Sequence, residues 1–543
     1  MQVLVTGGTG VVGEATVTRL LAHGHRVRVL SRHARDDARQ WPEGVEPWPG
    51  DVSDPASLTG AADGCEAVVH LVAIVRETGG ATFDAVNVVG TENVVREAER
   101  AGAPRFVYVS SLGCDRGTSA YHRSKSAGEV YTRRYRGPWT IVRLANVYGP
   151  GDEVISLLLR WVRTLPAVPV LDDGEDEFEP VWCEDAGEAL ARTVERDDLA
   201  GRVLEVSGGE RTCMNDVVNR LCTITNRDPW RIPIPAMLAA LGTRLGARLG
   251  LDLPVDEGQL RMLLEGNVVR APEGNALPAV LGVQPTALGD GLRRLADRQL
   301  EQLPSEGVGA LERKRFAVEI EGSRLSAEAL LERVRERFDE LTPWTMEMRA
   351  EPGTPTVVEE GATLTMTLPM RGNIQVRVQE VTPRSMTLVT LQGHPLAGAV
   401  RILSEPRGDR VRFEVQVIDR PATIADWLMM NPVGGQMQSA TWQSLLERVV
   451  AESGGRAPDG LEQETDTLNG AEASRVEEWM AALVRQRRRS ARQEEDPPER
   501  EQPAARPIAE PARSPAARST TSERMGPGTG PSSSALEEGP RAE

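Results

Sequence analysis

The chain has 543 residues, of which 26% are charged and 40% hydrophobic, and its formal net charge is −17. Because a single hydrophobic core rarely extends beyond about 250 to 300 residues, this length predicts more than one domain. The negative charge argues against nucleic acid as a general partner, and no apolar run approaches the roughly eighteen residues of a membrane-spanning helix. Five cysteines without a C-x-x-C pair, and no recognisable signal peptide, predict a cytoplasmic protein with reduced thiols.

The first predicted element is a strand at residues 2–5, which leads through TGGTGVVG into a helix. Within this turn Gly7, Gly10 and Gly13 have GxxGxxG spacing, and Gly8 also gives GxGxxG. Glycines at these positions permit a tight turn, close approach of a pyrophosphate and packing of the helix on the strand. The motif therefore predicts a dinucleotide site. Its turn residues are Gly7, Thr9, Gly10, Val11, Val12 and Gly13.

A second strand, within HRVRVLSRHAR, ends at Ser31 and Arg32. Sites for NAD usually have an acid here, which accepts a hydrogen bond from the ribose 2′-hydroxyl. This chain has no acid before Asp36, so the segment favours NADP(H) over NAD(H). The alternative is that Arg32 and Arg35 are ordinary solvated cations in an arginine-rich chain.

Only two of the 63 basic side chains are lysines, Lys125 and Lys314. Lys125 follows Tyr121 by four residues, a spacing that places both on one face of a helix. A nearby ammonium stabilises a phenolate, so we expect Lys125 to lower the tyrosine pKa from its ordinary value of about 10. The pair therefore predicts a proton donor and acceptor, the alternative being an ordinary exposed Tyr-Lys pair.

Six segments carry a family resemblance: TGGTGVVG, GDVSDPASL, VVHLVA, FVYVSS, YHRSK and IVRLANVYGPGD. In their order and spacing, residues 1–303 resemble the short-chain dehydrogenase/reductase superfamily, in its extended or atypical epimerase/dehydratase-like branch. The resemblance implies an α/β fold, a doubly wound parallel-sheet Rossmann domain with a core at about 1–150 and a substrate or cap region at about 151–303. It also implies nucleotide contacts from Asp51, Val52, Leu71, Ala73, Tyr121, Lys125 and Asn146.

The chain departs from that family pattern after the predicted fifth strand. It offers Ser110 and Ser111, but has Leu112 at a position often used by extended members. We therefore expect Ser111 to hold the substrate carbonyl beside Tyr121 and Lys125. This departure, the short segment before Tyr121 and the stretch beyond residue 232 are most similar to the subfamily of the NADPH-binding accessory subunit of respiratory complex I. That resemblance implies a chain that can hold the nucleotide without turning it over.

Two segments of the cap region permit other interpretations. An acidic cluster comprises Asp172, Asp173, Asp176 and Glu177. Because no histidine joins it, we expect a solvated loop and no metal site. Between residues 235 and 250, leucines recur at helical spacing opposite Arg244 and Arg248. This pattern predicts packing against the core or as a lid, and association with a membrane surface is the alternative.

Beyond a linker at 304–312, residues 313–455 have a different pattern. A strand at 315–322 and an amphipathic helix at 326–341 precede five strands and a helix at 434–453. The five strands are TLTMTLP, IQVRVQEV, SMTLVTL, AVRILSE and VRFEVQVID. This order resembles the α+β helix-grip fold of START-like (SRPBCC-type) domains, which implies an apolar cavity for a lipid, polyketide or quinone. We expect His394, in GHPLAG, to be a loop residue.

Residues 456–543 are too poor in large apolar groups to offset chain entropy, so they are predicted to form a disordered tail. A helix at 474–492 is the expected exception. Its apolar face comprises Val476, Trp479, Met480, Leu483 and Val484, and it continues into an arginine run. This face predicts either docking on the same chain or contact with a partner or an anionic membrane.

The sequence supports two functions of different classes. The first is an NADP(H)-binding oxidoreductase that acts on a small apolar carbonyl or quinone-like molecule, with Tyr121, Lys125 and Ser111 as catalytic residues. The second is a non-catalytic NADPH-binding structural or sensing module with a lipid- or quinone-binding second domain. Either one is compatible with a peripheral contact to the inner membrane or a respiratory complex. The sequence leaves the substrate and the oligomeric state open.

Overall fold

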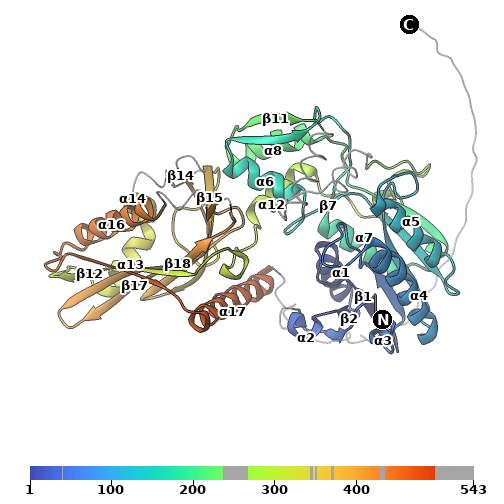
Figure 1. Ribbon diagram of the computed structural model, residues 1–543, viewed down its shortest axis with the longest axis horizontal. Helices are drawn as coiled ribbons and strands as arrows, with labels where there is room; N and C mark the ends of the chain where they lie inside the picture. The colour runs from blue at the N-terminus through green and yellow to red at the C-terminus, as the bar shows by residue number, and fades with distance from the viewer. Residues whose placement is uncertain are drawn as a thin grey trace, which may run out of the picture. The chain divides into compact units, whose positions relative to one another are not determined.

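The computed structural model describes residues 1–38, 41–235, 267–342, 347–348, 351–368, 372–424, 426–427 and 434–495. Residues 1–492 form one compact unit that contains two large sheets (Figure 1). The leucine-rich segment predicted between 235 and 250 lies outside the described residues apart from its first residue, as does the chain beyond 495.

The first sheet has seven strands, all paired in parallel, in the order β10-β6-β5-β4-β1-β2-β3. They are β1 (Gln2–Thr6), β2 (Arg26–Ser31), β3 (Val45–Pro49), β4 (Ala67–His70), β5 (Phe106–Ser111), β6 (Trp139–Leu144) and β10 (Arg202–Val206). The strand order reverses beside β1, and in doubly wound sheets ligands bind at the carboxyl ends of the strands around such a point. The predicted parallel sheet is confirmed.

Side chains along β1 alternate between the two faces of this sheet, and both faces are apolar. Helices therefore cover both faces. Val3 and Val5 pack in the core with α1 (Val11–Ala22) and α7 (Cys183–Glu195). Leu4 packs in the opposite core with α3 (Pro55–Leu58) and α4 (Gly90–Ala101). The remaining local elements are the short helix α2 (Ala34–Asp37), a π-helical turn at Asp84–Val89, and α5 (Ala120–Thr132).

The cap region is built from short strand pairs and helices around buried Tyr148 and Trp182. The strands are β7 (Val147–Tyr148) with β9 (Val181–Trp182), and β8 (Ala167–Leu171) with β11 (Trp230–Ile234). The helices are α6 (Ile155–Thr164), α8 (Met214–Thr225), α11 (Ala276–Ala279) and α12 (Leu288–Asp297). Among the described residues, no group of three or more His, Cys, Asp or Glu side chains is arranged to hold a metal ion.

The second sheet is antiparallel, with eight strands in the order β13-β14-β15-β16-β17-β18-β12-β19. They are β12 (Glu312–Glu321), β13 (Glu347–Met348), β14 (Thr363–Leu368), β15 (Gly372–Thr382), β16 (Ser385–Thr390), β17 (Leu396–Arg407), β18 (Arg410–Pro421) and β19 (Leu461–Thr467). Helices α13 (Ala327–Glu336), α14 (Phe338–Leu341) and α16 (Gly434–Ser453) share one core with it. The five strands predicted between β13 and α16 are all present.

The folded region extends further than the sequence predicted. We expected disorder from residue 456, but β19 pairs with β12 and is followed by α17 (Gly470–Glu495). Met480 and Val484 of α17 are buried with Val389 and Ala399 on the outer face of the sheet. The predicted apolar helix face therefore docks on its own chain. None of the helices in the described ranges is long and apolar enough to cross a membrane.

A buried ion pair joins the cap to the second sheet. Arg163 of α6 donates from Nε and Nη2 to the two carboxylate oxygens of Glu351, each at 2.9 Å. Both side chains are about 95% buried, at 4% and 5% exposure. Asn373 of β15 donates to the main-chain oxygen of Thr225 at 2.9 Å. These contacts connect segments far apart in the sequence.

Glu301 forms a second buried connection of this kind. Its carboxylate accepts hydrogen bonds from Arg377 at 2.9 Å, Gln379 at 3.1 Å and Arg488 of α17 at 3.0 Å. Burial acts to raise the pKa of Glu301, but the two guanidinium groups lower it overall.

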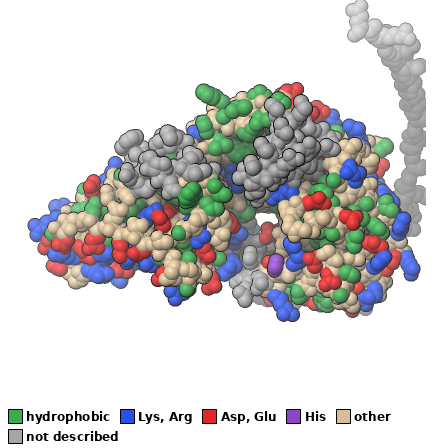
Figure 2. Space-filling model, in the orientation of Figure 1, with side chains coloured by type: hydrophobic (Ala, Val, Ile, Leu, Met, Phe, Trp, Pro, Cys, Tyr) green, Lys and Arg blue, Asp and Glu red, His purple; other side chains and the backbone are tan. Residues whose placement is uncertain are grey.

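Figure 2 shows acidic and basic side chains interspersed over the visible face of the described residues.

Candidate active site

A cavity of about 1050 Å³ opens at the carboxyl ends of the parallel strands. Every predicted nucleotide-binding and catalytic residue lines it. These residues are Gly7, Thr9, Gly10, Val11, Val12, Gly13, Ser31, Arg32, Asp51, Val52, Leu71, Ala73, Ser111, Tyr121, Lys125 and Asn146. Segments separated by more than a hundred residues thus meet at one edge of the sheet, as the resemblance implied.

The glycine turn between β1 and α1 fits a pyrophosphate. Gly7 has a φ of +78°, and a Cβ there would lie 2.9 Å from the main-chain nitrogen of Val72. A Cβ at Gly13 would collide with the carbonyl oxygen of Gly7, so α1 packs directly on the turn. In the described residues no side chain caps the N-terminus of α1, whose N-cap is Gly10. Open N–H groups and the positive end of the helix dipole suit a phosphate.

Asp51 lies at the end of the cavity formed by β2 and β3. Its carboxylate accepts hydrogen bonds from the main chain and hydroxyl of Ser53, at 2.9 and 2.6 Å. Burial acts to raise the pKa of Asp51, but these bonds and the positive charge of Arg32 lower it overall. Asp51 is therefore ionised at neutral pH, close to Arg32.

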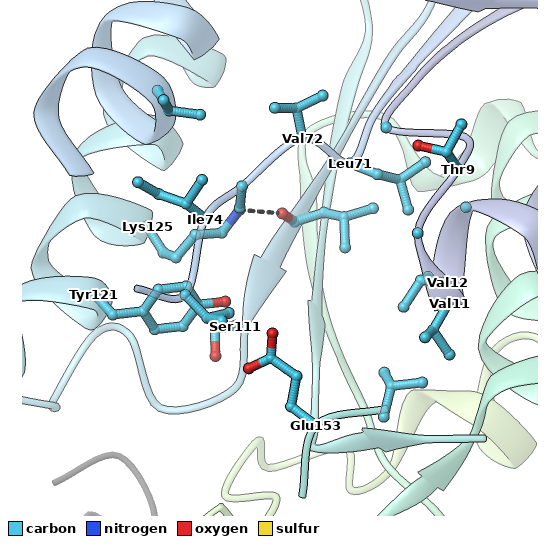
Figure 3. A pocket seen from close by; sticks show the side chains of 18 of the residues that line it. Thr9, Val11, Val12, Leu71, Val72, Ile74, Ser111, Tyr121, Lys125 and Glu153 are labelled. Carbon is cyan, nitrogen blue, oxygen red and sulfur yellow. Dashed lines mark hydrogen bonds between the residues drawn. The ribbon is translucent and has the colours of Figure 1, made fainter. Parts of the chain in front are cut away.

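Tyr121 and Ser111 present their hydroxyl groups to the same part of the cavity (Figure 3). Ser119 caps α5 by accepting a hydrogen bond from the main chain of His122, which places Tyr121 in the first turn of the helix. Burial raises the pKa of Tyr121 to about 12, although its hydrogen bond with Ser111 acts in the opposite direction. A protonated phenol paired with a serine hydroxyl can donate a proton to a bound oxygen.

The position of Lys125 corrects one expectation. Its Nζ donates to the main-chain oxygen of Val109 at 2.7 Å and lies 4.5 Å from the centre of the Tyr108 ring. Burial lowers the pKa of Lys125 to about 8. The ammonium therefore does not lower the pKa of Tyr121 as predicted, because it is directed at the strand backbone and burial of the phenol dominates.

A buried polar network holds α5 against the sheet one turn beyond Lys125. Arg143 of β6 donates to both carboxylate oxygens of Glu129, at 2.8 and 3.0 Å. The Cys114 thiol donates to the same carboxylate at 3.0 Å. Burial acts to raise the pKa of Glu129, but these partners lower it to about 2. The ion pair fixes the helix that carries Tyr121 and Lys125.

Several lining residues were not identified from the sequence. Glu153 follows Asp152, whose buried carboxylate accepts a hydrogen bond from the main chain of Ile155 at the start of α6. The Glu153 carboxylate points toward the Ser111 and Tyr121 hydroxyls (Figure 3). Asp37 of α2 lines the opposite end of the cavity. Apolar lining residues that were also missed are Ile74, Val75, Val86, Val154, Ile155 and Phe178. Glu153 could have been found from the sequence, because it directly follows the motif YGPGD. Asp37 could not, because only the path of α2 brings it to the cavity.

Comparison with known proteins agrees with this geometry. The sequence profile of the "NAD dependent epimerase/dehydratase family" matches residues 3–207. Ceramide reductase of Caulobacter vibrioides is 36% identical over 35% of this chain and 59% of its own length. Sterol demethylase protein B of Methylococcus capsulatus is 33% identical over 44% of this chain and 79% of its own. UDP-glucose 4-epimerase of Mycolicibacterium smegmatis is 32% identical over 35% of this chain and 72% of its own.

The profile match covers the glycine turn, the parallel sheet and most of the residues that line the cavity. The chain spans little more than half of the ceramide reductase but more than two thirds of the other two relatives. The glycine turn fits a dinucleotide phosphate on its own geometry, as described above. The chain therefore belongs to the NAD-dependent epimerase/dehydratase family.

Proposed function

We propose that this chain is an NADP(H)-dependent oxidoreductase that acts on an apolar carbonyl or quinone-like compound. The observation that carries the proposal is that Ser111, Tyr121 and Lys125 line the same cavity as the glycine turn. A nicotinamide nucleotide supplies the hydride when it is bound. The remaining tasks, which are binding, orientation and proton transfer, fall to the side chains of the cavity.

Tyr121 is the proton donor in this proposal. With a pKa of about 12 the phenol is protonated at neutral pH and holds a proton for a carbonyl oxygen that gains electrons, but a pKa so far above neutrality makes it a weak acid. Ser111 shares a hydrogen bond with Tyr121 and holds the same substrate oxygen. Lys125, fixed by Val109 and the Tyr108 ring, holds the nucleotide ribose at this end of the cavity.

The lining near Tyr121 supports an apolar substrate. Ile74, Val86, Val154 and Phe178 line the same cavity as Tyr121, and pockets with few polar groups among apolar walls bind apolar ligands. The relatives named for ceramide and sterol suggest a lipid-like substrate here too. Glu153, directed at the hydroxyl pair, favours a substrate that carries a hydrogen-bond donor near its carbonyl.

Arg32 supports the choice of NADP(H). It lines the cavity where β2 ends, the place at which NAD sites usually have an acid. A charge-assisted contact with a 2′-phosphate is worth about 1.5 to 3 kcal/mol, which corresponds to a preference of at least tenfold. Arg32→Ala should therefore weaken NADPH binding about tenfold and NADH binding much less.

A structural or sensing module remains the rival function. The observation that favours it is the amine of Lys125, which is bound to the main chain of Val109 and lies only 2% exposed. In that case the second sheet and α16, as a START-like helix-grip domain, would bind a lipid or quinone. The module would then act in peripheral contact with the inner membrane or with a respiratory complex.

Turnover distinguishes the two functions. We expect the full chain to retain NADPH through purification and to oxidise it with at least one member of a panel of long-chain ketones, ketosteroids and quinones. Tyr121→Phe should lower kcat by about 10² or more while nucleotide affinity changes little. If the wild type holds NADPH but reduces no member of the panel, and Tyr121→Phe lowers only thermal stability, the module is the better description.

A further inference from the structure

The end of the cavity beside β2 contains a carboxylate that the strand itself does not supply. After Ser31 and Arg32 the short helix α2 turns the chain back, so that Asp37 lines the same cavity as these two residues. The Ser31 hydroxyl donates to Asp37 Oδ2 at 2.6 Å and accepts from the main-chain N–H of His33 at 3.2 Å. Ser31 thus fixes the Asp37 carboxylate at the end of β2.

The charges around this position are mixed. Among the described residues that line the β2 and β3 end of the cavity, Arg32 contributes one guanidinium, while Asp37 and Asp51 contribute two carboxylates. The charge of Arg32 already acts on Asp51. A 2′-phosphate carries about −1.5 to −2 charges, whereas a 2′-hydroxyl is neutral and can donate a hydrogen bond. Arg32 therefore favours the phosphate, and the two acids oppose it.

We infer that Asp37 is a determinant of nucleotide choice, one that accepts a hydrogen bond from a 2′-hydroxyl and opposes a 2′-phosphate. The carboxylate that NAD sites place at the strand end is here supplied from α2, through its bond to Ser31. The site is consequently a balance between Arg32 and Asp37. This inference rests on the proposed nucleotide site but not on turnover.

Asp37→Asn tests the balance directly. Asparagine keeps an oxygen that can accept from Ser31 but removes the charge. Glu43→Gln is the matched control, since Glu43 is exposed, follows α2 and does not line the cavity. Affinities for NADPH and NADH are measured by titration calorimetry on the full chain. A second ligand pair, adenosine 2′,5′-bisphosphate and 5′-AMP, differs only in the 2′-phosphate and isolates this end of the site.

We expect Asp37→Asn to raise the NADPH-to-NADH affinity ratio about tenfold, with the same change in the ratio for the two adenosine ligands. Glu43→Gln should leave both ratios within about twofold, because screening weakens a more distant charge. Ser31→Ala should raise the ratio less than Asp37→Asn, since it frees the carboxylate without removing it.

The inference fails if Asp37→Asn leaves both ratios unchanged, or if Glu43→Gln shifts them equally, while the wild type still binds NADPH. It also fails if Asp37→Asn strengthens NADH instead. Loss of turnover with intact binding would overturn the oxidoreductase proposal alone. A wild-type chain that binds neither nucleotide would overturn both proposals.

Discussion

The two sheets of this chain use polar side chains in different places. In the parallel sheet, polar residues of the cavity lie at the carboxyl ends of strands, as Ser31 of β2 and Ser111 of β5 do, and face an open space. In the antiparallel sheet, polar residues lie along a face of β15, where Asn373, Arg377 and Gln379 are engaged by other parts of the chain. The first sheet thus presents polar groups at its strand ends to the cavity, whereas the second uses polar groups along β15 for docking.

The Arg163–Glu351 pair is the largest expected effect on the docking side of this comparison. Arg163→Ala leaves a buried carboxylate without its guanidinium, and breaking a buried pair costs about 3 to 5 kcal/mol. The free energy of unfolding, measured in urea, should fall by that amount. Arg293→Ala, which breaks the exposed pair with Asp290, should cost at most about 1 kcal/mol.

The double variant Arg163→Met with Glu351→Leu separates loss of the ion pair from the cost of leaving one buried charge unpaired. Because it removes both charges, it should be less destabilised than Arg163→Ala. Equal losses for Arg163→Ala and Arg293→Ala would show that the two sheets are not held together through this contact.

The two lysines permit the same substitution in both regions. Lys125→Arg puts a larger, planar group between Val109 and the Tyr108 ring, so turnover should fall at least about tenfold. Lys314→Arg keeps the ion pair with Asp419 at the half-buried end of β12 and should leave turnover unchanged. The measurement is kcat with the best substrate of the panel. A similar loss in both variants would point to stability instead of the site.

Protonation of His70 provides a smaller effect, specific to the parallel sheet. Burial, helped by the charge of Lys125, lowers the pKa of His70 to about 3. An unfolded histidine has a pKa of about 6.5, so the unfolded chain binds a proton that the folded chain excludes. The free energy of unfolding should therefore fall as pH decreases below about 6.5, by up to about 1.4 kcal/mol per pH unit.

Urea unfolding at about pH 7 and about pH 5 measures this loss, which should approach 2 kcal/mol for the single group. His70→Asn should remove that part of the pH dependence. His33→Asn, at an exposed histidine, is the control and should leave the pH dependence unchanged. An unchanged pH dependence in His70→Asn would assign the effect to other groups.

The smallest expected effect lies at the outer edge of the second sheet. Arg315 of β12 pairs with Glu464 of β19 across the strands, and both side chains are substantially exposed. Arg315→Gln should change the free energy of unfolding by about 0.2 to 1 kcal/mol. A loss as large as that of Arg163→Ala would contradict the distinction between buried and exposed docking contacts.

Local patterns predicted much of this architecture. The glycine turn, the alternation of strands and helices, and the Tyr121–Lys125 spacing predicted the parallel sheet and one edge at which its residues meet. Alternating apolar residues likewise predicted β14 to β18. These features depend on near neighbours in the sequence, where turn geometry and periodicity act.

The features that were missed depend on distant contacts or on polar strands. β19 reads LEQETDT, which lacks apolar alternation, and it is a strand because its charges pair with β12. The Arg163–Glu351 pair joins residues 188 apart, and no local pattern marks either partner. Asp37 lies only six residues from Ser31, yet α2 had to be placed before the two could be seen to meet.

Amine-directed reagents have few targets in this folded chain. Lys125 is 2% exposed and Lys314 is half-buried, while the amino group of Met1 lies 3.9 Å from Glu66. A pKa of about 8 makes the Lys125 amine partly neutral in mildly alkaline buffer, and therefore nucleophilic once it is reached. Acylation at Lys125 would thus report the molecules in which local unfolding has exposed this amine. For this protein, the rate of lysine labelling measures how often Lys125 becomes exposed. Mapping of the folded surface has to rely on arginine and carboxylate chemistry.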